Sequence, residues 1–165
     1  MPLNPQSSLT RLFNAPIRSG ALIWIGVRPE RRLVMRPVDE TMLDPHVGLE
    51  SDHYSRDSGK RQVTLIQAES LAAIASHLGL ETLAPEVLRR NLVTRGINLL
   101  ALKDRKFGIG DAMLEMTGEC HPCSRLEETL GVGGYHATRG FGGITAKVLT
   151  RGRIGVGEAI ARIDE

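Results

Sequence analysis

The sequence repeats one short pattern, because FGIGDAM at Phe107–Met113 matches IGVGEAI at Ile154–Ile160. In both copies an apolar run is followed by a glycine, an acidic residue and a new apolar run. Glycine tolerates a positive φ, so each copy can turn the chain sharply between two strands. Two copies are too few for a solenoid, and they indicate two similar corners of one curled antiparallel sheet.

Short apolar or alternating runs, typical of β-strands, surround this pattern. We expect strands at 21–27, 32–36, 61–66, 91–95, 99–102, 106–109 and 111–117. Helical spacing predicts a helix at 68–78 and a short one from Pro85 to about Arg90, whereas the polar stretch 37–59 is expected to be a long loop. The sequence therefore predicts a mainly β fold with a few helices, a curled antiparallel β-barrel.

The length of 165 residues predicts one barrel domain at 19–165, preceded by an arm at 1–18 without a clear period. No apolar run of about 20 residues exists, so we expect no membrane-spanning helix. A net charge of +2 and few aromatic residues argue against nucleic acid as a partner. The first residues do not resemble a signal peptide and the two cysteines form no disulfide framework, so we expect a cytoplasmic protein.

The segment with the most specific chemistry is Thr117–Gly131, TGECHPCSRLEETLG. We expect a strand to end near its start and a short helix to follow the proline. Ser124 and Glu127 have the spacing of a capping box, and the final glycine is a suitable helix stop. Cys123 would then lie just outside a helix N-terminus, where free N–H groups favour a thiolate. Cys123 is therefore the candidate catalytic and metal-binding residue.

The same segment leaves several kinds of chemistry open. Cys120 and Cys123 could be small buried residues, or they could form a thioredoxin-like C-x-x-C dithiol. Together with His121 and His136 they could bind zinc, although a second C-x-x-C is missing. Alternatively, the single thiolate of Cys123 could bind a soft, high-valent metal or carry sulfur.

A candidate anion site comes from the run Arg89-Arg90-Asn91, at the junction of a predicted helix and a predicted strand. The arginine fork suits a phosphate, and an asparagine amide can bind the edge of a heterocycle. Lys60 and Arg61 open another predicted strand and are further candidates. The chain has neither a P-loop nor a complete G-x-G-x-x-G motif, so a standard nucleotide site is not expected.

Five motifs, in order along the chain, resemble those of stand-alone bacterial MOSC-domain proteins. They are GLExD at 48–52, GKRQVTLI at 59–66, RNLVxxG at 90–96, FxIGD at 107–111 and PCxxL at 122–126. The domain is named after the C-terminal part of molybdenum cofactor sulfurases, and the resemblance covers about residues 20–160. Similar proteins often have Gly-Asp-Arg-His where this chain has Ser51-Asp52-His53-Tyr54, so no role is carried over to His53 and Tyr54.

This resemblance implies a barrel that binds the molybdenum cofactor, a pterin dithiolene with a phosphate. Cys123 matches the family's characteristic cysteine, which binds molybdenum in the reductase branch and carries sulfur in the sulfurase branch. Arg90 and Asn91 match the R-N motif and would hold the phosphate or the pterin. Less diagnostic positions near the same site are matched by Asp52, Lys60 and Arg61.

The leading hypothesis is the molybdenum subunit of a reductase that acts on N-hydroxylated or N-oxide compounds. Because the chain has no flavin, haem or iron–sulfur motif, electrons would come from a separate donor protein. One alternative is a sulfur-carrier or cofactor-delivery module that holds a persulfide on Cys123 and works with a cysteine desulfurase; another is a C-x-x-C dithiol oxidoreductase. The chain has no room for the desulfurase part of a complete sulfurase, so pyridoxal phosphate is not expected to bind.

Overall fold

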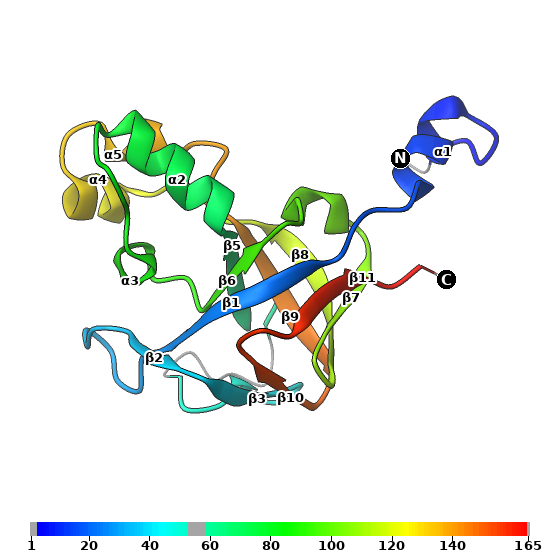
Figure 1. Ribbon diagram of the computed structural model, residues 1–165, viewed down its shortest axis with the longest axis horizontal. Helices are drawn as coiled ribbons and strands as arrows, with labels where there is room; N and C mark the ends of the chain where they lie inside the picture. The colour runs from blue at the N-terminus through cyan, green and yellow to red at the C-terminus, as the bar shows by residue number, and fades with distance from the viewer. Residues whose placement is uncertain (1–2, 53–58, 165) are drawn as a thin grey trace.

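The computed structural model describes residues 3–52 and 59–164, which form a β-barrel flanked by short helices (Figure 1). The strands are β1 (Gly20–Val27), β2 (Arg36–Val38), β3 (Glu40–Asp44), β4 (Gly48–Leu49), β5 (Val63–Gln67), β6 (Leu92–Arg95), β7 (Lys106–Ile109), β8 (Ala112–Glu119), β9 (Ile144–Thr150), β10 (Gly152–Gly155) and β11 (Ala159–Arg162). The helices are α1 (Ser8–Asn14), α2 (Ala68–His77), α3 (Pro85–Leu88), α4 (Ser124–Leu130), α5 (Gly134–Thr138) and the 3₁₀ helix η1 (Leu99–Leu102).

The barrel is closed and contains one parallel strand pair. Its strands follow the order β11-β7-β8-β9-β5-β6-β1, and β11 pairs with β1 to close the barrel. Strand β2 pairs with the last residues of β1. The predicted β-barrel with few helices is confirmed. The prediction that it is wholly antiparallel is wrong, because β5 and β6 are parallel. Helix α2 follows β5 directly and carries the chain back across the outside of the barrel, so β6 runs in the direction of β5.

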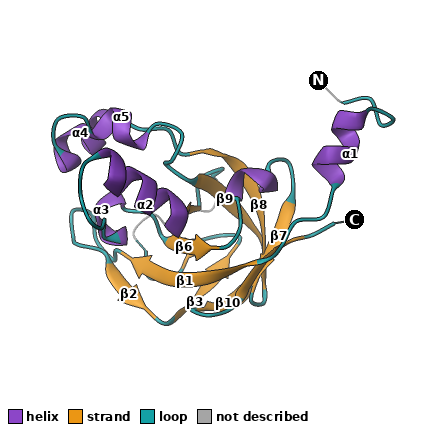
Figure 2. Cartoon of the chain, turned by 45° about the horizontal axis from the view of Figure 1, so that its top comes forward, coloured by secondary structure: helices purple, strands orange, loops and turns teal. Residues whose placement is uncertain are grey.

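Apolar side chains pack on both faces of the β5–β6 pair. Neighbouring residues of a strand point to opposite faces, so Leu65 and Leu92 belong to the core inside the barrel. Ile66 and Val93 belong to a second cluster that also contains Ile74 of α2. This second cluster attaches the helices to one side of the barrel, and the small sheet with β3 and β10 lies on another side (Figure 2).

Three local predictions were wrong. The expected loop at 37–59 contains β3 and β4, which pair with each other, while β3 also pairs with β10. The expected strand at 32–36 is a turn in which Arg32 takes a φ of 73°, and only Arg36 enters β2. Residues 99–102 form η1 instead of a strand, because the Asn98 side chain accepts a hydrogen bond from the Leu100 N–H. Each error arises where pairing or capping overrides local composition.

The repeated glycine pattern does produce two sharp turns. Gly110 and Gly157 have φ values of 53° and 97°, and each separates two strands. The first turn joins β7 and β8 of the barrel, as predicted. The second joins β10 of the small sheet to β11 of the barrel, so the two turns are not corners of one sheet. They lie together, since the Asp111 N–H donates to the carbonyl oxygen of Arg153 at 3.0 Å.

The N-terminal segment contains a helix that its sequence did not indicate. Ser7 caps α1 by accepting a hydrogen bond from the Thr10 N–H, and no residue of α1 is buried. In Figure 1 this helix projects near the C-terminal end. Arg162, whose side chain is only 3% exposed, donates to the carbonyl oxygens of Ala15 and Phe13 and thereby fixes the entry into β1. None of the described helices is long and apolar enough to span a membrane.

The loop at residues 140–143, directly before β9, contains three glycines and is called the glycine loop. Substitutions of Gly143 and Gly140 test how closely this loop approaches the barrel. Both residues have a positive φ, 90° and 80° respectively, so alanine is strained at both. A Cβ at Gly143 would overlap the carbonyl oxygen of Leu65, whereas a Cβ at Gly140 meets no atom within 4 Å. We expect Gly143→Ala to lower the free energy of unfolding by roughly 3–5 kcal/mol and Gly140→Ala by about 1 kcal/mol. Urea denaturation measures both, and equal losses would contradict this close approach.

Candidate functional site

The candidate site lies where the chain leaves β8 and enters α4. Cys123 is the N-cap residue of α4, as expected, and its side chain is exposed and makes no capping hydrogen bond. Its carbonyl oxygen accepts a hydrogen bond from the Leu126 N–H at 3.0 Å, which starts the helix. The position therefore leaves the sulfur of Cys123 open to solvent.

The predicted capping box between Ser124 and Glu127 is wrong. Ser124 is the first residue of α4, and the Glu127 carboxylate accepts hydrogen bonds from the N–H groups of Tyr135 and Gly133, at 2.7 and 2.8 Å. These two N–H groups lie at the start of α5, so the carboxylate joins α5 to α4. Donation by Tyr135 and Gly133 lowers the pKa of Glu127 below its ordinary value.

Cys120 has a different environment from Cys123, although both thiols are free. It is 5% exposed, and its N–H donates to the carbonyl oxygen of Gly143 at 2.8 Å. Burial raises the pKa of the Cys120 thiol, and the neighbouring guanidiniums of Arg90 and Arg61 oppose this rise. The structure thus brings two predicted cofactor-binding arginines to the buried cysteine.

Arg90 supports the wall beside Cys120. Arg89 ends α3 in the left-handed conformation, with a φ of 59°, and turns the chain toward the barrel. The guanidinium of Arg90 then donates from Nε to the Gly142 carbonyl oxygen at 2.8 Å and from Nη1 to the Leu88 carbonyl oxygen at 2.9 Å. Two of its nitrogens therefore hold backbone, while Nη2 lies close to Gly142.

Asn91 and Asp52 are both held inside the fold at the end of β1. The Oδ1 atom of Asn91 accepts from the N–H and the hydroxyl of Thr64, at 3.2 and 3.1 Å, and its Nδ2 donates to the Gly26 carbonyl oxygen at 3.3 Å. Asp52 accepts from the Arg28 N–H at 2.8 Å. The side chains of Asn91 and Asp52 are both more than nine-tenths buried. The structure therefore brings these two residues to one strand end, but it does not place them on an open surface.

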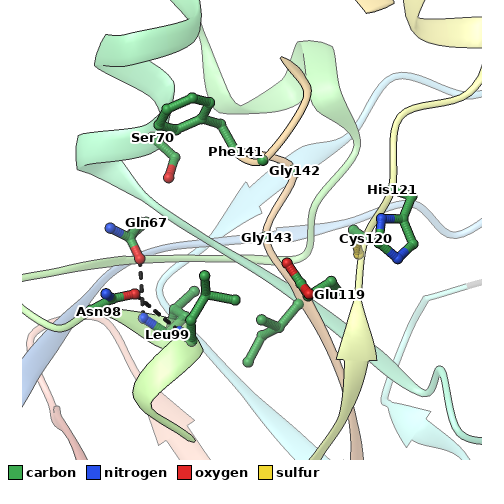
Figure 3. Close-up of a pocket in the computed structure, with 13 residues that line it drawn as sticks. Gln67, Ser70, Asn98, Leu99, Glu119, Cys120, His121, Phe141, Gly142 and Gly143 are labelled. Atoms are coloured by element: carbon green, nitrogen blue, oxygen red, sulfur yellow. Dashed lines mark hydrogen bonds between the residues drawn. The ribbon is translucent and has the colours of Figure 1, made fainter. Parts of the chain in front are cut away.

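Two clefts flank the segment from Glu119 to His121, and Glu119 and His121 line each of the two clefts. The first cleft, of about 220 Å³, lies between α2, η1 and the glycine loop before β9 (Figure 3). The second, of about 330 Å³, is lined by Lys60 and Arg61 together with the end of β8. Cys123 follows His121 by two residues, so the predicted basic residues and the predicted thiol lie at the same end of the barrel.

The zinc alternative finds no support in the described residues. Between 3 and 52 and between 59 and 164, no three His, Cys, Asp or Glu side chains gather in a way that could hold a metal ion. His53 and Tyr54, the residues at which the sequence departs from similar proteins, lie outside the described residues.

Comparison with known families identifies the class of protein to which this closed mixed barrel belongs. The pattern of the MOSC domain matches residues 44–161, so the chain belongs to the MOSC-domain family, as the resemblance of its motifs implied. In sequence, no curated protein matches the chain.

Solved structures share the fold. YuaD from Bacillus subtilis superimposes with a TM-score of 0.76 and 19% identity over 87% of this chain and 94% of that chain. YiiM from Escherichia coli gives a TM-score of 0.69 and 18% identity over 90% of this chain and 71% of that chain. YiiM from Geobacillus stearothermophilus gives 0.64 and 16%, over 87% and 73% respectively.

Several cleft residues were not predicted from the sequence. Ser70, Glu119 and Phe141 belong to no motif, and they meet in the first cleft only through the fold. One signal was available for Ser70, since it shares a helical face with Ile74 and His77. A serine on the apolar face of a helix indicates a polar neighbour or a cavity.

Replacement of Asn91 tests its role as a cross-link between strands. Asn91→Ala removes the acceptor of the Thr64 N–H and the amide donor to the Gly26 carbonyl oxygen, so we expect a loss of roughly 2–4 kcal/mol in the free energy of unfolding. Asn98→Ala, the control, removes one exposed hydrogen bond and is expected to cost about 1 kcal/mol or less. Chemical denaturation of both variants checks the difference; similar losses would show that the buried amide is not a cross-link.

The link between α4 and α5 predicts a pH dependence. Because folding lowers the pKa of Glu127, its ionised form stabilises the protein above the unfolded-state pKa, near 4.5, and this stabilisation is lost as the pH falls through the folded-state value. We expect Glu127→Gln to be less stable than wild type at pH 7, with the difference shrinking in acid. The exposed neighbour Glu128→Gln is the control and should show no such difference. Thermal unfolding at several pH values measures it, and a gap that persists in acid would refute the proposed cause.

Proposed function

We propose that this chain is the molybdenum subunit of a reductase that removes oxygen from N-hydroxylated or N-oxide compounds. Membership of the MOSC-domain family supports a connection with the molybdenum cofactor. The observation that carries the proposal is the exposed thiol of Cys123, whose side chain does not cap α4. Cys123 comes two residues after His121, which lines the cleft that contains Lys60 and Arg61.

The residues present fit the chemistry of the cofactor. A free, exposed thiol is a soft ligand suited to molybdenum. Lys60 and Arg61 line an open cleft that also includes His121, two residues before Cys123 in the chain, and their cationic side chains suit a phosphate. The cofactor, when bound, supplies two-electron oxygen-atom transfer.

The other predicted residues divide into binding and positioning roles. Cys123 would hold the metal through its sulfur, and Lys60 and Arg61 would hold the phosphate. Arg90 would offer positive charge to the phosphate through Nη2, while Nε and Nη1 donate to the carbonyl oxygens of Gly142 and Leu88 and hold the glycine loop in place. Asn91 and Asp52, which are buried and bonded within the fold, are proposed as residues that position the end of β1 beside the cofactor.

The proposal requires partners. A separate donor protein must deliver electrons to the exposed end of the barrel, and a small N–O compound is the substrate. These components would meet in the cytoplasm, where a free thiol such as Cys123 stays reduced.

The exposure of Cys123 also supports a second candidate, a sulfur carrier that receives a persulfide from a cysteine desulfurase. A carrier thiol must be reachable by a second protein, and that of Cys123 is exposed. The dithiol alternative is weaker, because Cys120 is buried and burial raises the pKa of its thiol. Thiol–disulfide exchange needs an accessible thiolate.

Metal analysis of matched cysteine variants tests the proposal. The protein is produced in a host able to make the cofactor, and bound molybdenum is measured in wild type, Cys123→Ala and Cys120→Ala. We expect Cys123→Ala to lose the metal and keep its stability, since the side chain is exposed. Cys120→Ala should keep the metal and lose about 1 kcal/mol of stability.

Each other result points to a specific alternative. Retention of molybdenum in Cys123→Ala would refute the role of this thiol as a metal ligand. A wild-type protein that lacks molybdenum and carries an extra mass of about 32 Da on Cys123 would favour the sulfur carrier. Equal loss of thiol–disulfide activity in both variants, without metal, would favour the dithiol.

A further inference from the structure

One side of helix α1 is an apolar stripe that faces solvent. Leu9, Leu12 and Phe13 have the i, i+3, i+4 spacing that places them on one side of a helix. Their exposed fractions are 48%, 72% and 56%, and no residue of α1 is buried. Thr10 lies on another side, where its hydroxyl donates to the Asn4 carbonyl oxygen at 2.6 Å. The helix therefore has a polar side that closes the turn before it and an apolar side that the barrel does not cover.

The barrel holds this helix by its C-terminal end. The nearly buried guanidinium of Arg162 donates to the carbonyl oxygens of Phe13 and Ala15, at 3.4 and 2.7 Å. Arg105 donates to the Phe13 carbonyl oxygen at 3.3 Å and to the side chain of Asn14. The last carbonyl groups of a helix carry partial negative charge, which the two cations offset. The apolar stripe is therefore displayed by an anchored helix.

The charges around the stripe are mainly positive. Arg11 and Arg18 are exposed, and residues 3–29 contain neither Asp nor Glu. Arg105 and Arg162 add two guanidiniums, and Asp164 is the one acidic side chain in the described residues that bonds to either of them. An apolar stripe surrounded by cations is complementary to a surface that is both apolar and anionic.

The place of α1 in the fold favours a flat partner. Figure 1 and Figure 2 show that it projects from the barrel close to the C-terminal end of the chain. A projecting ridge fits a flat, deformable surface, whereas a protein partner must supply a matching groove. A stable protein pair also buries roughly 800 Å² on each partner, which is more than three side chains on two turns of helix can cover. A lipid surface therefore fits this helix better than a second copy of the chain does.

We propose that α1 binds the surface of a membrane that contains anionic lipid. The apolar stripe enters the boundary between headgroups and acyl chains, and the surrounding arginines attract the lipid phosphates. The helix lies on the membrane and does not cross it. Because α4 lies at the opposite end of the long axis in Figure 1, the exposed thiol of Cys123 stays open to other molecules. This inference goes beyond the function proposed above and does not depend on bound molybdenum.

Vesicle flotation with the metal-free full chain tests this inference. One set of vesicles contains phosphatidylcholine alone, and the other contains phosphatidylcholine and phosphatidylglycerol in a three-to-one ratio. We expect binding to the anionic vesicles to be at least about fivefold tighter, because arginines close to an anionic surface are attracted to it. Raising the salt concentration should reduce this difference, since salt screens exposed charges.

Variants of the stripe separate this contact from general effects. Leu12→Glu should weaken binding to anionic vesicles about tenfold or more, because it removes an apolar contact and adds a charge of the same sign as the lipid. Val132→Glu is the matched control, since Val132 is fully exposed at the turn between α4 and α5, and it should bind as wild type does. Thermal unfolding of both variants checks that the fold is retained.

A fluorescence measurement locates the contact. The emission of a Phe13→Trp variant should shift to shorter wavelength when anionic vesicles are added, because the indole then leaves water. The chain has one other tryptophan, Trp24 of β1, so wild type provides the background for this measurement.

Three results would overturn the inference. They are no binding to anionic vesicles, equal binding to vesicles of phosphatidylcholine alone, or wild-type binding by Leu12→Glu. A chain that ignores vesicles but sediments as a dimer, with the dimer lost in Leu12→Glu, would also overturn it and would assign the stripe to a second copy. The vesicle and molybdenum measurements concern different residues at opposite ends of the molecule, so failure of one leaves the other standing.

Discussion

The amide of Asn91 is the interaction on which the helical end of the barrel depends. It joins Thr64, at the start of the parallel β5–β6 pair, to Gly26 near the end of β1, and it does so while almost wholly buried. Parallel strands need a crossover connection, and here α2 and α3 form it. The buried amide closes this connection against the barrel, so the residues on either side of it, Arg90 and the strand β6, take fixed positions.

The glycine loop before β9 carries this constraint to the candidate site. Arg90 holds the Gly142 carbonyl oxygen, and the Cys120 N–H holds that of Gly143. Because neither glycine has room for a side chain, the loop lies directly against β5 and the end of β8. The same contacts leave one cysteine buried behind the loop and the other exposed at the start of α4. The family resemblance concerns the exposed one.

Much of the fold was predictable because its strands are short, apolar and bounded by glycine, and because α2 has a clear helical period. The parallel pair was not predictable from local pattern, since the direction of a strand depends on how its crossover packs. The small sheet was missed because β3 and β4 are only five and two residues long and are defined by pairing, β3 with β10 and with β4. For the site, Cys123 was predicted through a motif and a helix start, whereas Ser70 and Glu119 meet only in three dimensions and belong to no motif.

The buried guanidinium of Arg162 has a consequence for the connectivity of the chain. It donates to the carbonyl oxygen of Ala15 at 2.7 Å and to the carboxylate of Asp164 at 2.6 Å. Residues 15 and 164 therefore lie on either side of a single side chain, as the ends of a domain often do. One side chain thus ties the segment that enters β1 to the segment that leaves β11, so a change that loosens one of these segments also loosens the other.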